Sequence, residues 1–285
     1  MRKRFLIVNA DDLGISESTN QAIFQLFEEE KITSAGILAP APHAREAALA
    51  AGQRGYSIGV HWTLHSEWPG ELGWLPCDPE ARSLLEEGRL TASMARVKTA
   101  SSRDVTRELE AQYRALADWG CTPDHADSHC GTLYGINGRL FFLNAYGLCR
   151  KNGLPFRFAR GDSFLTRQFG PEVSTALKLA SRTVAGVGKL YGAALLDDFC
   201  SDPRPAEKIS GISDLKAYYG SQLSTLRGDI CEIFLHPCLP DEALLSRSPQ
   251  WQKRVWEYEY LKSGQLLTAA REQGFTLVSW SQAPF

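Results

Sequence analysis

The strongest limit on the fold of this chain comes from an apolar run near its start that ends in two adjacent carboxylates. The run extends from Phe5 to Ala10, and Asp11, Asp12 and then Gly14 follow. Runs rich in β-branched and aromatic residues are typical of strands covered on both faces, which form parallel sheets with helices outside. In such folds the chemistry lies at the carboxyl ends of the strands. We therefore expect a buried strand that delivers acid to a site.

The acid pair itself needs an explanation. Two neighbouring carboxylates repel each other, so they are costly to hold together unless a cation or a shared proton compensates. We interpret Asp11 and Asp12 as part of a metal site. A plainer interpretation is that one of them caps the helix that is predicted to begin near Ser16.

Strand and helix patterns alternate along the whole chain. After the first strand, the apolar patterns predict strands over 32–39, 56–61, 154–159, 230–235 and 275–280, and 125–129, which Pro123 introduces, is a short strand-like stretch. Helices are predicted over 16–31, 43–51 with Gly52 as the stop, 105–119, 137–152, 213–226 and 251–273, the last interrupted near Gly264. This order requires parallel pairing with right-handed crossovers. About seven strands favour a closed or nearly closed, distorted (β/α) barrel over an open sheet.

Two stretches break the alternation within what we interpret as one domain, residues 1–285. The first is a loop over 62–101 that carries Trp62, Trp68 and Trp74. Their indoles suit stacking on sugar rings, or they simply pack the loop onto the barrel. The second is an insertion over 161–211, in which 173–190 is compatible with a helix and Asp197-Asp198 is predicted as loop. We interpret the insertion as a lid or an oligomer contact, such as that of a homodimer.

Composition excludes several classes of function. A net charge of −2 without any basic block argues against a nucleic-acid surface, and no apolar run approaches the length of a membrane span. The basic start, residues 1–4, precedes an apolar segment that is too short for a signal peptide. The 7 cysteines are odd in number, scattered and free of Cys-x-x-Cys pairs, which fits reduced thiols. We expect a cytoplasmic enzyme without nucleic-acid or membrane partners.

The histidines gather at one kind of place. His61, His125 or His129, and His236 each follow or end a predicted strand, as the acid pair does. In a parallel barrel these ends share one rim, so we expect the side chains to converge. The other two histidines, His43 and His65, lack this placement and are predicted in loops or on the surface.

These residue types suit metal-assisted hydrolysis. Two imidazoles and a carboxylate hold a divalent cation and leave positions open for water and substrate. The ion lowers the pKa of its water and polarises a carbonyl. The second acid of the pair can then accept the proton of the water, and His236 can protonate the leaving group. Asp127 is expected to orient an imidazole.

Four segments together resemble the successive motifs of the YdjC family, known for its chitooligosaccharide deacetylases. They are Asn9–Gly14, Gly59–Leu64, His125–His129 and Leu235–Pro237. The resemblance implies a metal-dependent N-deacetylase of acetylated amino sugars, with a small carbohydrate as substrate, on a barrel like that of the polysaccharide deacetylases. One divalent ion, Mg²⁺ or Zn²⁺, is implied.

Matching positions imply a role for each residue. Asp12, His61 and His129 would bind the metal, with Asp11 as base and His236 as acid. The expected substrate-binding or supporting residues are His125, Asp127, Arg157 and Trp62. After His129 the chain continues Cys130 to Gly135, where many members carry further histidines; we expect this departure to affect sugar specificity and not the ligand set.

Two other functions remain open from the sequence. One is a different metal-dependent amide, ester or phosphoester hydrolysis on the same barrel, which a fold alone does not distinguish. The other is a non-catalytic sugar-binding protein. The presence of Asp11 counts against the second, because a binder needs no base.

Overall fold

The computed structural model describes residues 3–135, 137–248 and 250–285. Met1 and Arg2, which belong to the basic start, lie outside the described residues. None of the helices among the described residues combines the length and apolar character needed to cross a membrane. All seven cysteines are unpaired.

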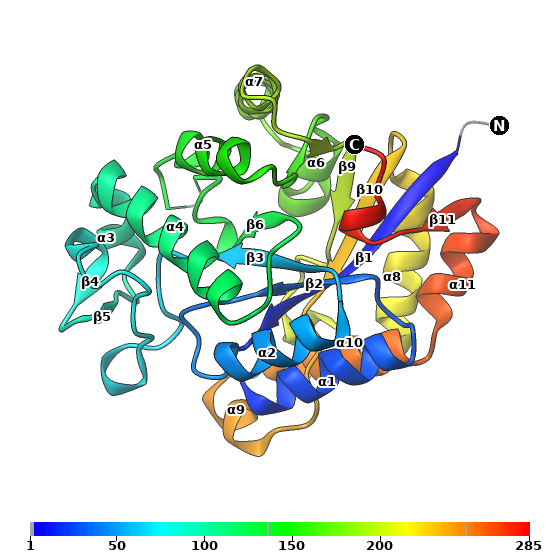
Figure 1. Cartoon of the computed structure of the whole chain (residues 1–285). Coiled ribbons are helices and arrows are strands. Elements are labelled where there is room, and N and C mark those ends of the chain that lie inside the picture. The colour runs from blue at the N-terminus through cyan, green and yellow to red at the C-terminus, as the bar shows by residue number, and fades with distance from the viewer. Residues whose placement is uncertain (1–2, 136, 249) are drawn as a thin grey trace.

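The main sheet is parallel throughout and nearly closes into a barrel (Figure 1). Its strands run in the order β8-β7-β6-β3-β2-β1-β10-β9, and β11 pairs with β1 as a branch. The strands are β1 (Arg4–Leu13), β2 (Ser34–Ile37), β3 (Ile58–Trp62), β6 (Ala126–Ser128), β7 (Phe156–Ala159), β8 (Leu195–Leu196), β9 (Asp198–Cys200), β10 (Ile230–Leu235) and β11 (Phe275–Leu277). Only Asp197 separates the two end strands, β8 and β9, in the sequence. The predicted distorted (β/α) barrel is confirmed.

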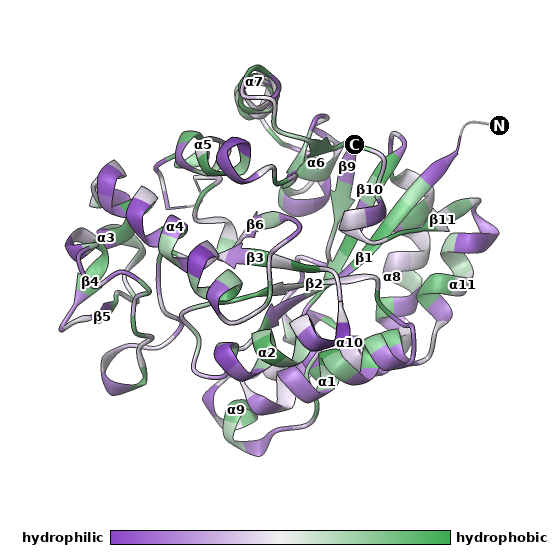
Figure 2. Cartoon of the chain, in the orientation of Figure 1, coloured by the Kyte–Doolittle hydropathy of each residue, from purple (hydrophilic) through white to green (hydrophobic). Residues whose placement is uncertain are grey.

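Helices surround the strands (Figure 1). The longer ones are α1 (Glu17–Glu28), α2 (Ala44–Arg54), α4 (Ser102–Asp118), α5 (Phe142–Asn152), α7 (Thr175–Leu190), α8 (Ile212–Thr225), α10 (Gln250–Lys262) and α11 (Gln265–Glu272). The shorter ones are α3 (Met94–Thr99), α6 (Ser163–Phe169) and α9 (Glu242–Arg247). Most of the central strands are apolar and the helices alternate between polar and apolar residues (Figure 2), as expected when each helix turns one face to the sheet.

The N-cap of α1 shows whether Asp11 or Asp12 caps this helix. The Ser16 hydroxyl accepts a hydrogen bond from the backbone N–H of Thr19 and caps the helix. Neither Asp11 nor Asp12 is needed there, so the plainer interpretation of the pair is wrong.

The end of α2 also differs from expectation. The helix passes through Gly52 and ends at Arg54, followed by Gly55 in the left-handed conformation at φ 65°. A Cβ atom on Gly52 would overlap the backbone carbonyl of Gly120. The glycine at 52 therefore permits close packing inside a helix and does not stop it.

The two irregular stretches contain more structure than their sequences indicate. Asp198, predicted in a loop, begins β9, so the segment predicted as an insertion supplies two barrel strands. The 62–101 stretch includes α3 and a small hairpin of β4 (Leu85–Glu86) and β5 (Arg89–Leu90). It is anchored to α4 by Glu108, whose carboxylate accepts hydrogen bonds from the backbone N–H groups of Cys77 and Asp78 at 3.0 and 2.8 Å.

Candidate metal centre

A β-bulge near the end of β1 positions the acid pair. Ala10 lies opposite Ala35 of β2, but Leu13 lies opposite Ile37, so β1 has one residue more than its neighbour. Asp12 adopts a left-handed backbone at φ 70°. Successive strand residues normally point to opposite faces, and a bulge redirects side chains. As a result, Asp11 and Asp12 each place an oxygen within 4.8 Å of a ring nitrogen of His61.

The first cluster, which we call the imidazole group, consists of Asp12, His61 and His129. Asp12 Oδ1 lies 3.3 Å from His61 Nε2 and 3.1 Å from His129 Nδ1, and these two nitrogens are 3.2 Å apart. All three residues are buried, and among the described residues neither oxygen of Asp12 accepts a hydrogen bond. A buried carboxylate without a donor is costly, and one oxygen with two imidazole nitrogens is a donor set for a divalent cation. These residues therefore fit a metal ion.

Two further residues border the imidazole group and were missed in the sequence. Arg254 Nη1 lies 2.7 Å from Asp12 Oδ2, at ion-pair distance but without hydrogen-bonding geometry. Glu67 Oε1 lies 3.3 Å from His129 Nε2. Burial would raise the pKa of Asp12, but Arg254 and His129 hold it well below its usual value. Neither Arg254 nor Glu67 ends a strand, so the strand-end pattern could not identify them.

The second cluster, the guanidinium group, surrounds the buried Arg157 of β7. Its guanidinium donates to both oxygens of Asp11 at 2.7 and 2.8 Å and to Glu232 at 2.8 and 3.0 Å, and Nη1 lies 2.5 Å from Asp127 Oδ2. Burial acts to raise the pKa of Asp11, but the charge of Arg157 prevails and lowers it to about 2. Asp11 is therefore ionised at neutral pH. For Glu232, burial outweighs Arg157 and raises the pKa.

Asp127 connects the two groups. Its Oδ1 lies 2.7 Å from His61 Nδ1, while its Oδ2 contacts Arg157. With Nδ1–H donating to the carboxylate, His61 turns its Nε2 toward Asp12. Asp127 thus fixes the orientation of one imidazole.

His236 lies beside the guanidinium group, just after β10. Its Nε2 is 4.0 Å from Asp11 Oδ2, and its Nδ1 is 3.7 Å from Oε2 of Glu257. The same Glu257 oxygen accepts the backbone N–H of His236 at 2.7 Å. The His236 side chain is 32% exposed, so it can reach a bound molecule. Glu257, on α10, was missed in the sequence.

Two expected supporting residues are not brought to these groups. Trp62 is fully buried and its indole N–H donates to the carbonyl of Leu109 on α4, so it packs in the core. His125 precedes β6, contacts Asp124 at 2.6 Å and stacks on Trp280 with ring centroids 4.7 Å apart.

The two remaining histidines, His43 and His65, differ in their exposure. His43 has a side chain that is 39% exposed, as predicted. His65 lies in a loop, one of the two predicted alternatives, but it is buried, and its ring stacks on that of His129 with centroids 5.3 Å apart. The strand-end pattern missed it because it lies three residues beyond the end of β3.

The tryptophans of the loop pack mainly on protein. Trp74 is 3% exposed and lies edge-on to Trp68, which stacks on Trp251 of α10. Trp74 also lies 6.0 Å from the ring of His129, so this packing forms one wall of the imidazole group.

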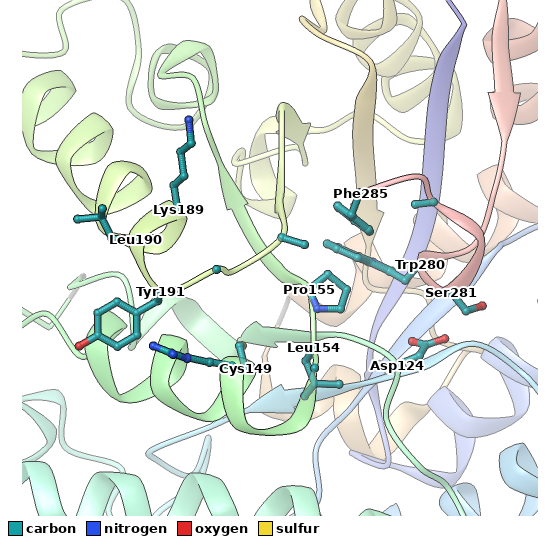
Figure 3. A pocket seen from close by; sticks show the side chains of 15 residues that line it. Asp124, Cys149, Leu154, Pro155, Lys189, Leu190, Tyr191, Trp280, Ser281 and Phe285 are labelled. Carbon is teal, nitrogen blue, oxygen red and sulfur yellow. The ribbon is translucent and has the colours of Figure 1, made fainter.

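A cavity of about 680 Å³ is lined by none of the residues of the two groups. Asp124, Pro155 and Trp280 line part of it (Figure 3). Because Asp124 and Pro155 come just before β6 and β7, the cavity lies at the amino ends of these strands. The imidazole group lies at the carboxyl ends of β1, β3 and β6, where parallel barrels place their chemistry.

Fold and site together define an α/β-barrel protein with a carboxylate–imidazole centre at the carboxyl ends of its strands. The chain belongs to the YdjC-like protein family, whose model matches residues 5–272. It is 29% identical over 282 residues to a carbohydrate deacetylase of Geobacillus stearothermophilus, covering 98% of each chain. A chitooligosaccharide deacetylase of Klebsiella pneumoniae is 26% identical over 288 residues, covering 96% of this chain and 97% of the relative.

A solved structure shares the fold. A crystal structure of an Enterococcus faecalis protein superposes with a TM-score of 0.77 at 24% identity and covers 98% of each chain. The family that the four sequence segments indicated is thus confirmed.

Proposed function

We propose that this chain is a metal-dependent hydrolase that removes N-acetyl groups from acetylated amino sugars or their oligosaccharides. The observation that carries the proposal is the convergence of Asp12, His61 and His129, with ligand atoms within 4.8 Å of one another, beside Asp11 and His236. The names of the relatives from Geobacillus stearothermophilus and Klebsiella pneumoniae support a carbohydrate substrate and the removal of an acetyl group.

Asp12, His61 and His129 would hold the cation. When bound, a divalent ion polarises a carbonyl and makes water more acidic. Imidazole nitrogens favour Zn²⁺, and Mg²⁺ is compatible if water completes its coordination, so both ions belong in the assay. Asp127 keeps His61 in the required orientation through the contact at 2.7 Å.

Asp11 is the residue that accepts the proton of the attacking water. Its two oxygens are fixed by Arg157, and its lowered pKa keeps it ionised at neutral pH. The hydroxyl oxygen then forms a bond to the acetyl carbonyl carbon.

His236 is the acid in this scheme. The bond from the acetyl carbon to the sugar nitrogen breaks, and the nitrogen leaves as an amine after it receives a proton from His236. Glu257 orients His236 through its backbone N–H and its ring. Because Asp11 and His236 face each other at 4.0 Å, base and acid can act on the same amide.

The test is acetate release from a panel of N-acetylated mono- and oligosaccharides, with and without a chelator. We expect release that the chelator abolishes and that added Mg²⁺ or Zn²⁺ restores. Activity that is indifferent to the chelator would contradict the metal chemistry. A protein that binds the cation but releases no acetate from any sugar would instead favour another hydrolysis or a sugar-binding protein.

Two variants separate the roles. Asp11→Asn should still bind the cation but lose about 10²–10⁴-fold in kcat, because only the base is removed. His61→Ala should lose both cation binding and turnover. Equal turnover of Asp11→Asn and the unmodified protein would exclude Asp11 as the base.

A further inference from the structure

His129 faces a second set of ligand-type side chains with its other nitrogen. Its Nδ1 points to Asp12 and His61, whereas its Nε2 lies 3.5 Å from Cys130 Sγ. One ligand atom each from His65, His129 and Cys130 lies within 4.8 Å of the others. This thiol–imidazole group shares only His129 with the imidazole group.

We propose that His65, Cys130 and Nε2 of His129 form a second cation site, selective for thiophilic divalent cations such as Zn²⁺ or Cd²⁺. A thiolate with two imidazoles favours such ions over Mg²⁺, which prefers oxygen. Tetrahedral zinc takes four ligands, and Glu67 Oε1, 3.3 Å from His129 Nε2, offers the fourth.

The local structure holds these side chains together. The Thr63 hydroxyl accepts the backbone N–H of His65 and donates to its carbonyl, which turns the chain back after β3 and buries His65 against His129. Cys130 directly follows His129 and is exposed, so an ion from solvent can reach the thiol. The site is therefore fixed on one side and open on the other.

The shared imidazole makes the two sites antagonistic. A neutral imidazole has one lone pair, so when Nδ1 binds a cation, Nε2 carries the proton. A second cation at Nε2 requires either that the ring lose this proton or that Nδ1 release its ion, and the two positive charges also repel. Binding at each site therefore weakens binding at the other. Excess thiophilic cation should inhibit the proposed deacetylation.

The test is a Cd²⁺ titration of the full chain in the presence of Mg²⁺, followed by the ultraviolet sulfur-to-cadmium charge-transfer absorption. We expect the absorption of one thiolate per chain. Cys130→Ser should lose it, and His65→Asn should weaken Cd²⁺ binding at least about tenfold. The matched control is Cys77→Ser, a half-buried thiol outside both groups, which should keep the absorption.

A further variant tests the antagonism. In Asp12→Asn the imidazole group is disabled, so the absorption should develop at lower Cd²⁺ than in the unmodified protein. Absence of the absorption at millimolar Cd²⁺, its persistence in Cys130→Ser, or its loss in Asp12→Asn would each overturn the second site. Acetate release measured without Cd²⁺ tests the proposed function separately, so the two proposals fail independently.

Discussion

The two buried groups at the centre of the barrel balance their charges in different ways. In the guanidinium group, Asp11, Asp127 and Glu232 all contact one arginine, so the protein supplies the cation itself. In the imidazole group, Asp12 accepts no hydrogen bond among the described residues. The guanidinium group is therefore a structural ion-pair network. The imidazole group, in which Arg254 lies beside Asp12 without hydrogen-bonding geometry, is the candidate for a cation site.

The contrast also explains why the acid pair consists of two adjacent residues. The bulge in β1 gives one carboxylate to each group, with Asp11 held by Arg157 and Asp12 turned to the histidines. Asp11 is held in its ionised form by Arg157, and Asp12 faces the two imidazoles. The following predictions test whether Asp11 and Asp12 belong to two groups that balance their charges in different ways.

Arg157→Met should have the largest effect on stability. Removing the guanidinium leaves three buried carboxylates without their cation, so we expect the free energy of unfolding to fall by about 3–5 kcal/mol. The matched control is Arg160→Met, which removes an exposed arginine paired with Asp197 and should change the free energy by less than about 1 kcal/mol. Urea denaturation measures both. Similar losses in the two variants would mean that Arg157 does not neutralise the guanidinium group.

An added cation should stabilise the folded protein by binding at the imidazole group. At a concentration of 100 times Kd, Mg²⁺ should raise the free energy of unfolding by about 2.7 kcal/mol, because the ion binds the folded state. Thermal unfolding with and without the ion measures this. Asp12→Asn should show no such increase, whereas Asp11→Asn should retain it. An equal increase in both variants would place the ion outside the imidazole group.

Asp127→Asn tests the contact between the groups. The amide cannot hold the His61 ring as a carboxylate does, and loss of such a supporting contact lowers metal affinity about 10–100-fold. Isothermal titration calorimetry with the metal measures the change. Asp124→Asn is the control, since Asp124 contacts His125 away from both groups. Unchanged affinity in Asp127→Asn would show that His61 does not depend on this carboxylate.

Much of the arrangement of the two groups could be predicted from the residues at the strand ends. Seven of the nine strands of the main sheet, as described for residues 3–135, 137–248 and 250–285, were predicted, six of them from apolar patterns and β6 from a short strand-like stretch. Their ends brought Asp11, Asp12, His61, His129 and His236 into the hypothesis. The missed strands, β8 and β9, have two and three residues, too few for a periodic signal.

The missed site residues come from other kinds of position. Arg254 and Glu257 lie within α10, and Glu67 lies in the 62–101 stretch, so their approach to the site depends on tertiary packing that no local pattern encodes. Glu232 did leave a signal, because a carboxylate inside the apolar strand 230–235 must have a buried partner. The prediction for Trp62 failed in the opposite way. This aromatic residue at a strand end was expected to bind substrate or support the site, but it packs in the core.

Glu257→Gln gives the smallest expected effect, and it depends on pH. Burial would raise the pKa of Glu257, but the hydrogen bond with His236 and the charge of Lys253 lower it. The folded state therefore binds a proton less readily than the unfolded state, in which the pKa of glutamate is about 4.3. The stabilisation by the carboxylate is complete above that pH and is lost as the pH falls through the lowered folded value.

We accordingly expect Glu257→Gln to reduce the free energy of unfolding by about 1 kcal/mol at pH 7, and the difference from the unmodified protein to shrink below about pH 4. Denaturant unfolding at several pH values measures it, with the exposed Glu259→Gln on the same helix as control. A difference that stays constant down to pH 2 would mean that the charge of Glu257 does not stabilise the fold. Glu257 would then support His236 through hydrogen-bond geometry alone, unlike the carboxylates of the guanidinium group.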